Sequence, residues 1–441
     1  MGSSPSRRST ALVVAISALV GLVLAIVLVL GPAAGATEPV VTGSVLLAFG
    51  IGWFLLALLS VRYTDQPQRW AFVPGVSMSL VGVALVVASP TQQVMNALSW
   101  LWPPALSVLV VWMAMRIRRD LHGRGTWLLY PIVFVLGLIA IGGAFETLSA
   151  ARDDAAYRMP GQLVDVGGRK LYIECSGTGE PTVVFESGLA EGSPYWVRIA
   201  SAVSKTTHVC VYDRAGRGPS DDAPGPQDGG AVARDLHALL ADSGNAGPFI
   251  LVGHSTGGPY IRAFAATYPD EVAGMVLLDA QPTDAFTALP TFPSFYSGIG
   301  LKAGLLPSLA RIGIWRILTA ATPLDLPSPY REAEQAEQST PRLLSAQRDE
   351  FAVLPATLAQ GAALTTLGAK PLVVVTAGTD AQAGWAEAQD EMAALSSDSS
   401  HRVASDQTHT SLIASEEGAA LSARAIEDVI MSSRTGAAVV D

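Results

Sequence analysis

One serine in this sequence lies in a setting that can make its hydroxyl a nucleophile. Ser255 sits between Gly253 and Gly257 in a G-x-S-x-G pattern, after the apolar run 249–252 and before the amphipathic stretch 260–268. The flanking glycines allow a sharp turn from strand to helix, which exposes the hydroxyl at the positive end of the helix. A glycine-rich turn without chemistry is the alternative, but the strand before it and the helix after it favour a nucleophile elbow.

The elements that must hold this serine follow from the pattern after residue 158. Short apolar runs, several of them ended by Gly, Asp or Ser, alternate with helical stretches, as expected for parallel strands buried on both faces. Strands are expected at 170–175, 182–185, 207–212, 249–252, 275–278 and 372–375. The alternation predicts an α/β domain over residues 158–441, with a doubly wound and mostly parallel sheet.

Residues 158–431 resemble the α/β-hydrolase family, with the character of a serine esterase or lipase. The resemblance rests on the elbow and on the segments 184–189 (Val-Phe-Glu-Ser-Gly-Leu), 211–220 (Val-Tyr-Asp-Arg-Ala-Gly-Arg-Gly-Pro-Ser) and 268–279. It implies that the backbone N–H groups of Leu189 and Thr256 form the oxyanion hole. Many members have His-Gly where this chain has Ser187 and Gly188, but main-chain donors do not need that histidine.

The family places an acid and a base after the serine, in the order Ser, Asp, His. Asp380 follows the apolar run 372–377 in a Gly-x-Asp pattern and is the expected acid, and Asp279, a position that some members use, is the alternative. Either aspartate could instead be a turn residue or a polar strand end. His409 lies just before the C-terminal helical stretch, and it is the histidine with the order and place of the base.

Together these residues imply acyl transfer through a covalent intermediate. His409 would take the proton of Ser255 as the hydroxyl attacks a carbonyl, Asp380 would orient the imidazole, and water would later release the acyl group. This chemistry requires no metal and no organic cofactor. A serine nucleophile argues against haloalkane dehalogenase or epoxide hydrolase activity, because relatives with those activities use Asp at that position.

A long insertion, about 281–369, separates the apolar runs 275–278 and 372–375, where the family usually carries a helical cap. Its early part is apolar, and its later part, 330–350, is charged. The simplest interpretation is a lid that packs on its own domain. A lid that lines an apolar pocket is the sharper hypothesis, and it implies a lipophilic ester or other acyl substrate.

The first 150 residues hold most of the excess apolar character behind the mean hydropathy of +0.37. Five apolar runs approach the length of about 20 residues that a helix needs to cross a bilayer. Transmembrane helices are therefore expected at about 11–30, 41–61, 70–89, 98–115 and 127–147. A cleaved signal peptide is the alternative for the first run, which is long for that role.

Arginines set the expected orientation of these helices. Two arginines precede the first apolar run, and two more lie between the second and third runs. Further arginines lie between the fourth and fifth runs. The alternate loops, 31–40 and 90–96, contain no Lys or Arg. The positive-inside rule places the N-terminus in the cytoplasm, and five crossings place the α/β domain outside it. The expected location is the plasma membrane, with the lipid bilayer as a partner.

The two cysteines, Cys175 and Cys210, lack the spacing of a metal site. The family's sheet order makes their strands neighbours, so a disulfide is open to them outside the cytoplasm. Two buried thiols are an equal alternative, because neighbouring positions in a parallel sheet are a demanding geometry for a bridge.

The amino-acid composition gives information on the expected partners and on the kind of genome that encodes the chain. The net charge of −10 gives no reason to expect nucleic acid as a partner. Arginine carries most of the positive charge, and Ala and Gly are abundant, a bias typical of GC-rich bacterial coding sequences.

Other classes of function remain open beside a membrane-anchored serine hydrolase. A peptidase, thioesterase, lactonase or perhydrolase would use the same chemistry. A ligand-binding or sensing module could use the same pocket, although a pure binder need not keep Ser, Asp and His in order. Transport by the helices is disfavoured, because they contain almost no charged residues to line a polar path.

Overall fold

The structure is a computed structural model that describes residues 9–157, 159–379 and 381–439. The chain divides into two compact units. The first, here called the helical unit, extends to Arg152 and also includes Gly300–Leu318. The second, here called the sheet unit, consists of Asp153–Ile299 and the chain from Thr319 onward.

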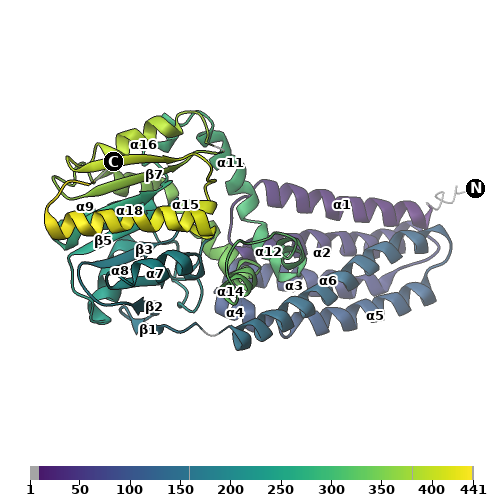
Figure 1. Ribbon diagram of the computed structural model, residues 1–441. Coiled ribbons are helices and arrows are strands. Elements are labelled where there is room, and N and C mark those ends of the chain that lie inside the picture. The colour runs from purple at the N-terminus through teal and green to yellow at the C-terminus, as the bar shows by residue number, and fades with distance from the viewer. Residues whose placement is uncertain (1–8, 158, 380, 440–441) are drawn as a thin grey trace, which may run out of the picture. The chain divides into compact units, whose positions relative to one another are not determined.

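The helical unit contains a bundle of apolar helices from the first part of the chain, drawn in purple and blue in Figure 1. Within the described residues, four helices are long and apolar enough to cross a membrane, and a fifth span results if the bent pair α4–α5, with 44° between its members, is one span. The helices are α1 (Thr10–Leu30), α2 (Glu38–Tyr63), α3 (Phe72–Ala88, preceded by the 3-10 turn η1, Arg69–Ala71), α4 (Gln92–Leu98), α5 (Trp102–Asp120) and α6 (Arg124–Ala156).

The predicted span 98–115 differs most from its observed counterpart. The helix breaks at residues 99–101, and α5 begins at Trp102 with prolines at the next two positions, which a first helical turn tolerates because its N–H groups have no intrahelical acceptor. α5 then runs on to Asp120 and carries arginines near its end, so it is less apolar than the other long helices. The other predicted spans overlap the helices α1, α2, α3 and α6, of which α6 is the longest, with 33 residues.

The division of the chain also departs from the predicted one, because part of the expected cap belongs to the helical unit. Buried pairs of opposite charge hold that part, Arg311 with Glu38 and Arg316 with Glu146. Helices fill the insertion between the sixth and seventh strands: α10 (Ala285–Ala288), α11 (Phe292–Ala303), α12 (Leu306–Arg311), α13 (Ile314–Thr319), α14 (Tyr330–Gln338) and α15 (Pro341–Ala362).

The sheet unit is built on an eight-stranded sheet in the order β1-β2-β4-β3-β5-β6-β7-β8. The pairs β1–β2 and β2–β4 are antiparallel, and the other neighbouring pairs are parallel. The predicted mostly parallel, doubly wound sheet is therefore confirmed. Its strands are β1 (Gln162–Asp165), β2 (Lys170–Ser176), β3 (Thr182–Glu186), β4 (Val209–Asp213), β5 (Phe249–His254), β6 (Val272–Leu278), β7 (Leu372–Ala377) and β8 (Ser399–Ala404).

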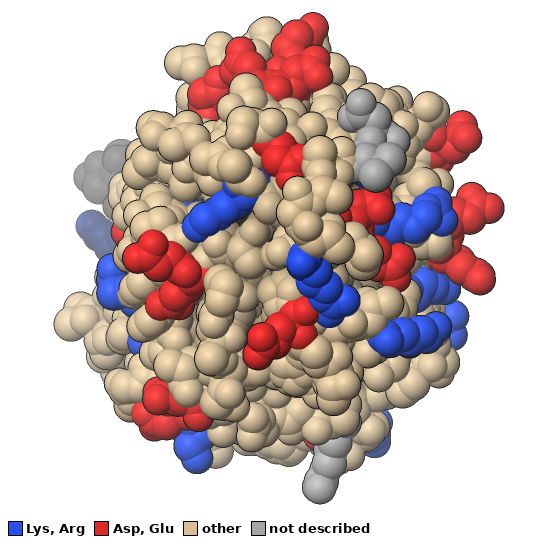
Figure 2. Space-filling view, turned by 60° about the vertical axis from the view of Figure 1, so that its left-hand side comes forward, with Lys and Arg blue, Asp and Glu red and all other residues tan. Residues whose placement is uncertain are grey.

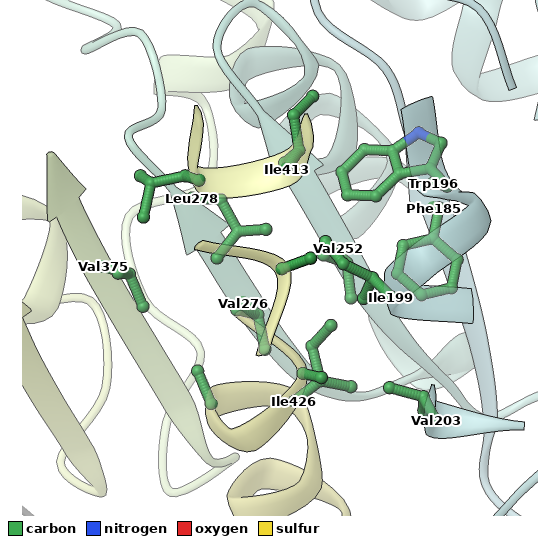
Figure 3. Close-up of a cluster of buried hydrophobic side chains, with 14 of the residues drawn as sticks. Phe185, Trp196, Ile199, Val203, Val252, Val276, Leu278, Val375, Ile413 and Ile426 are labelled. Atoms are coloured by element: carbon green, nitrogen blue, oxygen red, sulfur yellow. The ribbon is translucent and has the colours of Figure 1, made fainter. Parts of the chain in front are cut away.

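Helices cover both faces of this sheet, and alternate strand residues point to opposite faces. Ile250 and Val252 of β5 join the core cluster that Figure 3 shows, whereas Phe249 and Leu251 join a second cluster on the other face. The first face carries η2 (Ser193–Trp196), α7 (Val197–Val203), α17 (Ser411–Ala414) and α18 (Glu416–Thr435). The second carries α8 (Gly229–Asp242), α9 (Gly257–Thr267) and α16 (Trp385–Ala393), and η3 (Pro269–Glu271) leads into β6.

Charged and apolar side chains are distributed differently over the surface of the molecule. Acidic and basic side chains are interspersed on the face that Figure 2 displays, with wide uncharged areas between them. On the helical unit, large apolar side chains stand in the open: Val87 and Trp127 are each 79% exposed and Val108 is 72% exposed. Extended apolar surface of this kind is typical of helices that face lipid.

Candidate active site

Ser255 occupies the sharp turn between β5 and α9. Its φ of 54° lies in the left-handed region, which residues other than glycine adopt at a cost and which is frequent at functional sites. The flanking glycines are required by space: a methyl group on Gly253 would lie 2.8 Å from the carbonyl carbon of Gly257, and one on Gly257 would overlap the backbone oxygen of Glu186. This is the geometry that a nucleophile elbow requires.

His409 meets a carboxylate at the end of β6. Its Nδ1 lies 2.5 Å from Oδ2 of Asp279, whose other oxygen accepts hydrogen bonds from Trp385 Nε1 at 2.8 Å and from the N–H of Ala377 at 3.1 Å. Burial raises the pKa of Asp279, but the hydrogen bond and charge of His409, with the two other donors, outweigh burial and leave this pKa below its ordinary value. The aspartate is therefore a fixed, ionised partner for the imidazole.

The sequence offers two candidate acids for His409, Asp380 and Asp279. Asp380, the acid that the sequence favours, lies outside the described residues. The Nδ1 atom of His409 has one hydrogen-bonding position, and Asp279 occupies it. Among the residues that the structure describes, the alternative aspartate, Asp279, is thus the carboxylate that meets His409.

The imidazole of His409 lies beside the elbow. Its ring centroid is 4.5 Å from that of His254, the residue before Ser255. The side chains of Ser255 and His409 are both described, and no hydrogen bond joins them. Contacts of this type are often long in free enzymes and shorten when substrate binds. The side chain of His409 is 42% exposed, so the ring is open to an incoming molecule.

His254 forms a buried bridge behind this ring. Its Nδ1 lies 2.8 Å from a carboxylate oxygen of Glu191, and its Nε2 lies 2.9 Å from the backbone oxygen of His409. An imidazole that donates from both nitrogens is positively charged. Burial lowers the pKa of His254, but the charge and hydrogen bond of Glu191 outweigh burial and raise this pKa above its ordinary value. The charged ring therefore links Glu191 to the main chain of His409.

The loop after β3 passes directly beside Ser255. A methyl group on Gly188 would lie 2.8 Å from Cβ of Ser255, which shows how closely the loop approaches. The N–H of Gly188 donates to Glu191 at 2.7 Å, whereas the N–H groups of Leu189 and Thr256 donate to no other group in the part of the chain that the structure describes. Two N–H groups with free donors near a serine hydroxyl are what an oxyanion hole needs.

Buried arginines hold the carbonyl side of the same loop. Arg217 donates to the backbone oxygens of Gly188 at 2.8 Å and of Glu191 at 2.5 Å, and its guanidinium meets Glu350 of α15 at 2.6 Å. Arg214 also meets Glu350, at 3.0 Å. Burial raises the pKa of Glu350, but the two guanidinium charges outweigh burial and leave this pKa below its ordinary value. A cap helix is thereby fixed to the loop that passes Ser255.

Cys175 and Cys210 form a disulfide between directly opposed residues of β2 and β4. The expected parallel pairing of these strands is wrong: they run antiparallel, and opposed residues of an antiparallel pair lie close together. Together with His208, the two cysteines form a cluster of possible metal ligands. Among the described residues, the ligand atoms of these three lie within 4.8 Å of one another. Because the disulfide uses both sulfurs, this group offers no thiolate to a metal.

A match to a known family decides the identity of the fold. The model of the family described as alpha/beta hydrolase fold matches residues 181–415, more than half of the chain. The chain belongs to the α/β-hydrolase fold family. The matched range begins before β3 and ends after α17, so it contains the elbow, Asp279 and His409.

Two relatives of this α/β-hydrolase match part of the chain. Uncharacterized protein YbdG of Bacillus subtilis is 31% identical over 161 residues, 35% of this chain and 50% of that protein. An uncharacterized vacuolar membrane protein of Saccharomyces cerevisiae is 35% identical over 105 residues, 23% of this chain and 16% of that protein. The chain thus spans half or less of the length of these two relatives. The similarity to a vacuolar membrane protein and the apolar helices of this chain together indicate a membrane protein.

Among solved structures, the Cif epoxide hydrolase from Acinetobacter nosocomialis is similar to this α/β-hydrolase. Its TM-score is 0.54 at 15% sequence identity, over 65% of this chain and 96% of that one. At this identity the similarity concerns the fold. The chemistry of the present chain has to be inferred from its own residues.

Three charged residues that position this site, Arg217, Glu350 and Glu191, are not predictable from local sequence patterns. Arg217 lies in the segment 211–220 that carries the family resemblance, but its partners do not appear in that pattern. Glu350 lies in the charged part of the cap, where a charge run is usually interpreted as a solvated helix face. Glu191 is 63 positions from His254, and no local pattern links the two.

Proposed function

We propose that this α/β-hydrolase is a serine hydrolase that cleaves an ester or another acyl bond. One observation carries the proposal: Ser255 occupies a strained elbow in the same unit in which Asp279 holds the imidazole of His409. The three residues follow the order Ser, Asp, His along the chain. A pure binding module has no need of a strained serine beside a carboxylate-oriented imidazole.

In this mechanism His409 accepts the proton of Ser255 as the serine oxygen attacks the acyl carbonyl carbon. Asp279 keeps Nδ1 protonated and stabilises the imidazolium that forms. The N–H groups of Leu189 and Thr256 bind the oxyanion, and each such donor contributes about 3 kcal/mol to transition-state stabilisation. The leaving group departs with the proton from His409, and a water that His409 deprotonates then releases the acid from the acyl-enzyme.

A lipophilic substrate is favoured by the side chains beside the oxyanion loop. Leu189 packs against an apolar cluster formed mainly by cap helices and completed by Trp385, the residue that also binds Asp279. Partly buried members of this cluster include Phe286 and Tyr296. Aromatic and aliphatic surface next to an oxyanion site suits an acyl chain or an aromatic group.

Membrane anchoring is the second part of the proposal. The proposed location is the plasma membrane, with several spans and a cytoplasmic N-terminus, and the arginine distribution supports this orientation. Five crossings, with the bent pair α4–α5 counted as one, put the sheet unit outside the cytoplasm. The disulfide between Cys175 and Cys210 supports this side, because disulfides persist in oxidising compartments.

Labelling by a fluorophosphonate probe tests the chemistry. Wild-type protein in detergent is expected to take up the probe, and Ser255→Ala is expected to lose it. Ser201→Ala, an exposed serine of α7, is the matched control and should label like the wild type. An unlabelled wild type, or a Ser255→Ala variant that still labels, would contradict the proposal. Binding of p-nitrophenyl esters without turnover would then favour a ligand-binding or sensing module.

A series of p-nitrophenyl esters tests the substrate class. Longer acyl chains are expected to raise kcat/KM, because the cluster around Leu189 can bury them. Hydrolysis of short, water-soluble esters with none of longer ones would contradict the lipophilic part of the proposal while leaving the serine chemistry in place.

A further inference from the structure

Residues 300–318, here called the cap segment, pack into the helical unit where α1 ends and α2 begins. Ser308 shares a 2.9 Å hydrogen bond with Thr42 of α2. Leu305 packs against a small apolar cluster that contains Val29 of α1 and Val41 of α2. The cap segment is therefore a structural part of the bundle, although the chain reaches it from the sheet unit.

Arg311 makes the most extensive polar contact of this segment. Its guanidinium pairs with Glu38 in the first turn of α2, with 2.8 Å between Nη2 and Oε2. It also donates to the hydroxyl of Ser99 at 2.7 Å and to the backbone oxygen of Met95 at 3.2 Å. The side chains of Arg311 and Glu38 are 8% and 0% exposed. Because removing one partner from a buried ion pair is strongly destabilising, this contact fixes the segment on the bundle.

The chain after Arg311 reaches the apolar part of α6. Residues 127–145 of α6 contain no Asp, Glu, Lys or Arg, and Glu146 ends this stretch. Gly142 lies about 6 Å before Glu146 along the helix axis. A methyl group on Gly313 would lie 2.7 Å from the carbonyl oxygen of Gly142, so the two backbones touch there. Arg316 then pairs with Glu146, with 2.6 Å between Nε and Oε2.

The short helix α13, which follows the contact with Gly142 of α6, exposes large apolar side chains. Ile317 is 66% exposed, Leu318 is 55% exposed and Ile314 is 42% exposed. Residues three and four apart lie on one face of a helix, so the three side chains form one apolar face. The arginine beside them is paired and largely buried, as charges at membrane depth are expected to be.

We propose that α13 lies within the outer leaflet of the bilayer, with Ile314, Ile317 and Leu318 against lipid acyl chains. Lipid is the occupant because the segment belongs to the same compact unit as the apolar helices and touches α6 inside its charge-free stretch. The inference rests on the membrane anchoring in the proposed function. It gives the bundle a role beyond anchoring, since it holds the middle of the cap in lipid, and it favours a substrate that resides in the bilayer.

Fluorescence quenching tests this contact. Ile317→Cys is labelled with an NBD iodoacetamide, in protein whose own cysteines are joined in the disulfide, and reconstituted into phosphatidylcholine vesicles. Val87→Cys, on the exposed side of α3, is the control for lipid contact, and Val403→Cys, exposed on β8, is the control for water contact. Doxyl-labelled phosphatidylcholine should quench the label at residue 317 about as strongly as the label at 87, and iodide should quench the label at 403.

Each outcome decides one part of the inference. A label at residue 317 that doxyl lipid does not quench overturns lipid contact by α13: quenching by iodide would then indicate water at the helix, and quenching by neither agent would indicate a protein surface. A label at residue 87 that doxyl lipid does not quench overturns the anchoring on which the inference rests. Fluorophosphonate labelling of the same samples reports on Ser255 independently, so a failure of the lipid contact and a failure of the proposed chemistry are distinguishable.

Discussion

His254 donates from Nε2 to the backbone carbonyl of His409 at 2.9 Å, while its Nδ1 meets Glu191 at 2.8 Å. Glu191 also accepts the N–H of Gly188 at 2.7 Å, next to Leu189 in the loop that passes Ser255. The proposed base and the proposed oxyanion loop are therefore tied to one buried ion pair. Fixing both sides of a site before substrate arrives is the condition for preorganised electrostatic catalysis.

Replacing His254 by Gln is expected to lower kcat about 100-fold with a smaller change in KM, because a displaced imidazole loses its alignment with the serine. Gln can still donate to the carbonyl of His409 but carries no charge. The acidic limb of the pH–rate profile should move to higher pH, since Glu191 without its imidazolium partner favours a protonated base. Rates of p-nitrophenyl ester hydrolysis across about pH 5 to 9 measure both effects.

A double variant separates the charge of this pair from its packing. Adding Glu191→Gln to His254→Gln should return the acidic limb toward its wild-type position while kcat stays low. A profile that does not move in the single variant, with a melting temperature equal to that of the wild type, would contradict a positioning role for the ion pair.

Asp279→Asn is expected to lower kcat by on the order of 10⁴-fold, because an amide does not hold the imidazole in the tautomer with hydrogen on Nδ1. Asp380→Asn is the matched control and should keep most of the activity. Ester hydrolysis and the rate of fluorophosphonate labelling measure the comparison. A larger loss in Asp380→Asn than in Asp279→Asn would reverse the assignment of the acid.

The choice between these aspartates shows the limit of local patterns. Each follows an apolar run that predicts a strand, and spacing alone does not tell which carboxylate turns toward His409. The environment of Asp279 depends on Trp385 and Ala377, which are 106 and 98 positions away. The elbow at Ser255 is predictable because strand, glycines and helix adjoin one another in the chain.

The differences between prediction and structure arise from pairings between residues that are distant in the chain. Whether β2 runs parallel or antiparallel to β4 depends on how the chain connects them, and the apolar runs do not reveal it. Arg311 and Glu38 are 273 positions apart, so nothing local assigns the cap segment to the helical unit. The long helices were predictable because length and apolarity are local properties.

The buried carboxyl of Glu334 makes stability depend on pH. Its Oε2 has no hydrogen-bond partner among the residues that the structure covers, and burial, with the charge of Asp213, raises its pKa from 4.5 to about 8. The folded state therefore holds this proton more tightly than the unfolded state. The resulting stabilisation is complete below about pH 4.5 and is lost as the pH rises toward 8.

Glu334→Gln is expected to remove this loss. The variant should gain on the order of a few kcal/mol relative to the wild type at alkaline pH and show little difference in acid, because the amide is neutral at both. Melting temperatures at about pH 5 and pH 9 measure it. Glu332→Gln on the same helix is the control, because the pKa of Glu332 is lowered rather than raised. An equal gain at both pH values would point to packing instead of charge.

The disulfide is expected to contribute to stability and not to chemistry. Across β3, Cys210 of β4 is level with Leu251 of β5, four residues before Ser255, so the bridge lies away from the turn that carries the serine. The bridge joins residues 35 positions apart, and a loop of that length corresponds to about 4 kcal/mol in the chain-entropy model. Cys175→Ala with Cys210→Ala should therefore lower the free energy of unfolding and leave kcat for p-nitrophenyl esters unchanged.

Thiol titration checks the bridge in the wild-type protein. Denatured protein prepared without reductant should have no reactive thiol, and the same sample after reduction should have two, matching the two cysteines of the chain. Thiols that react before reduction would contradict the bridge. They would also remove the support that it lends to an extracytoplasmic sheet unit, because the oxidising side of the membrane is where such a bond persists.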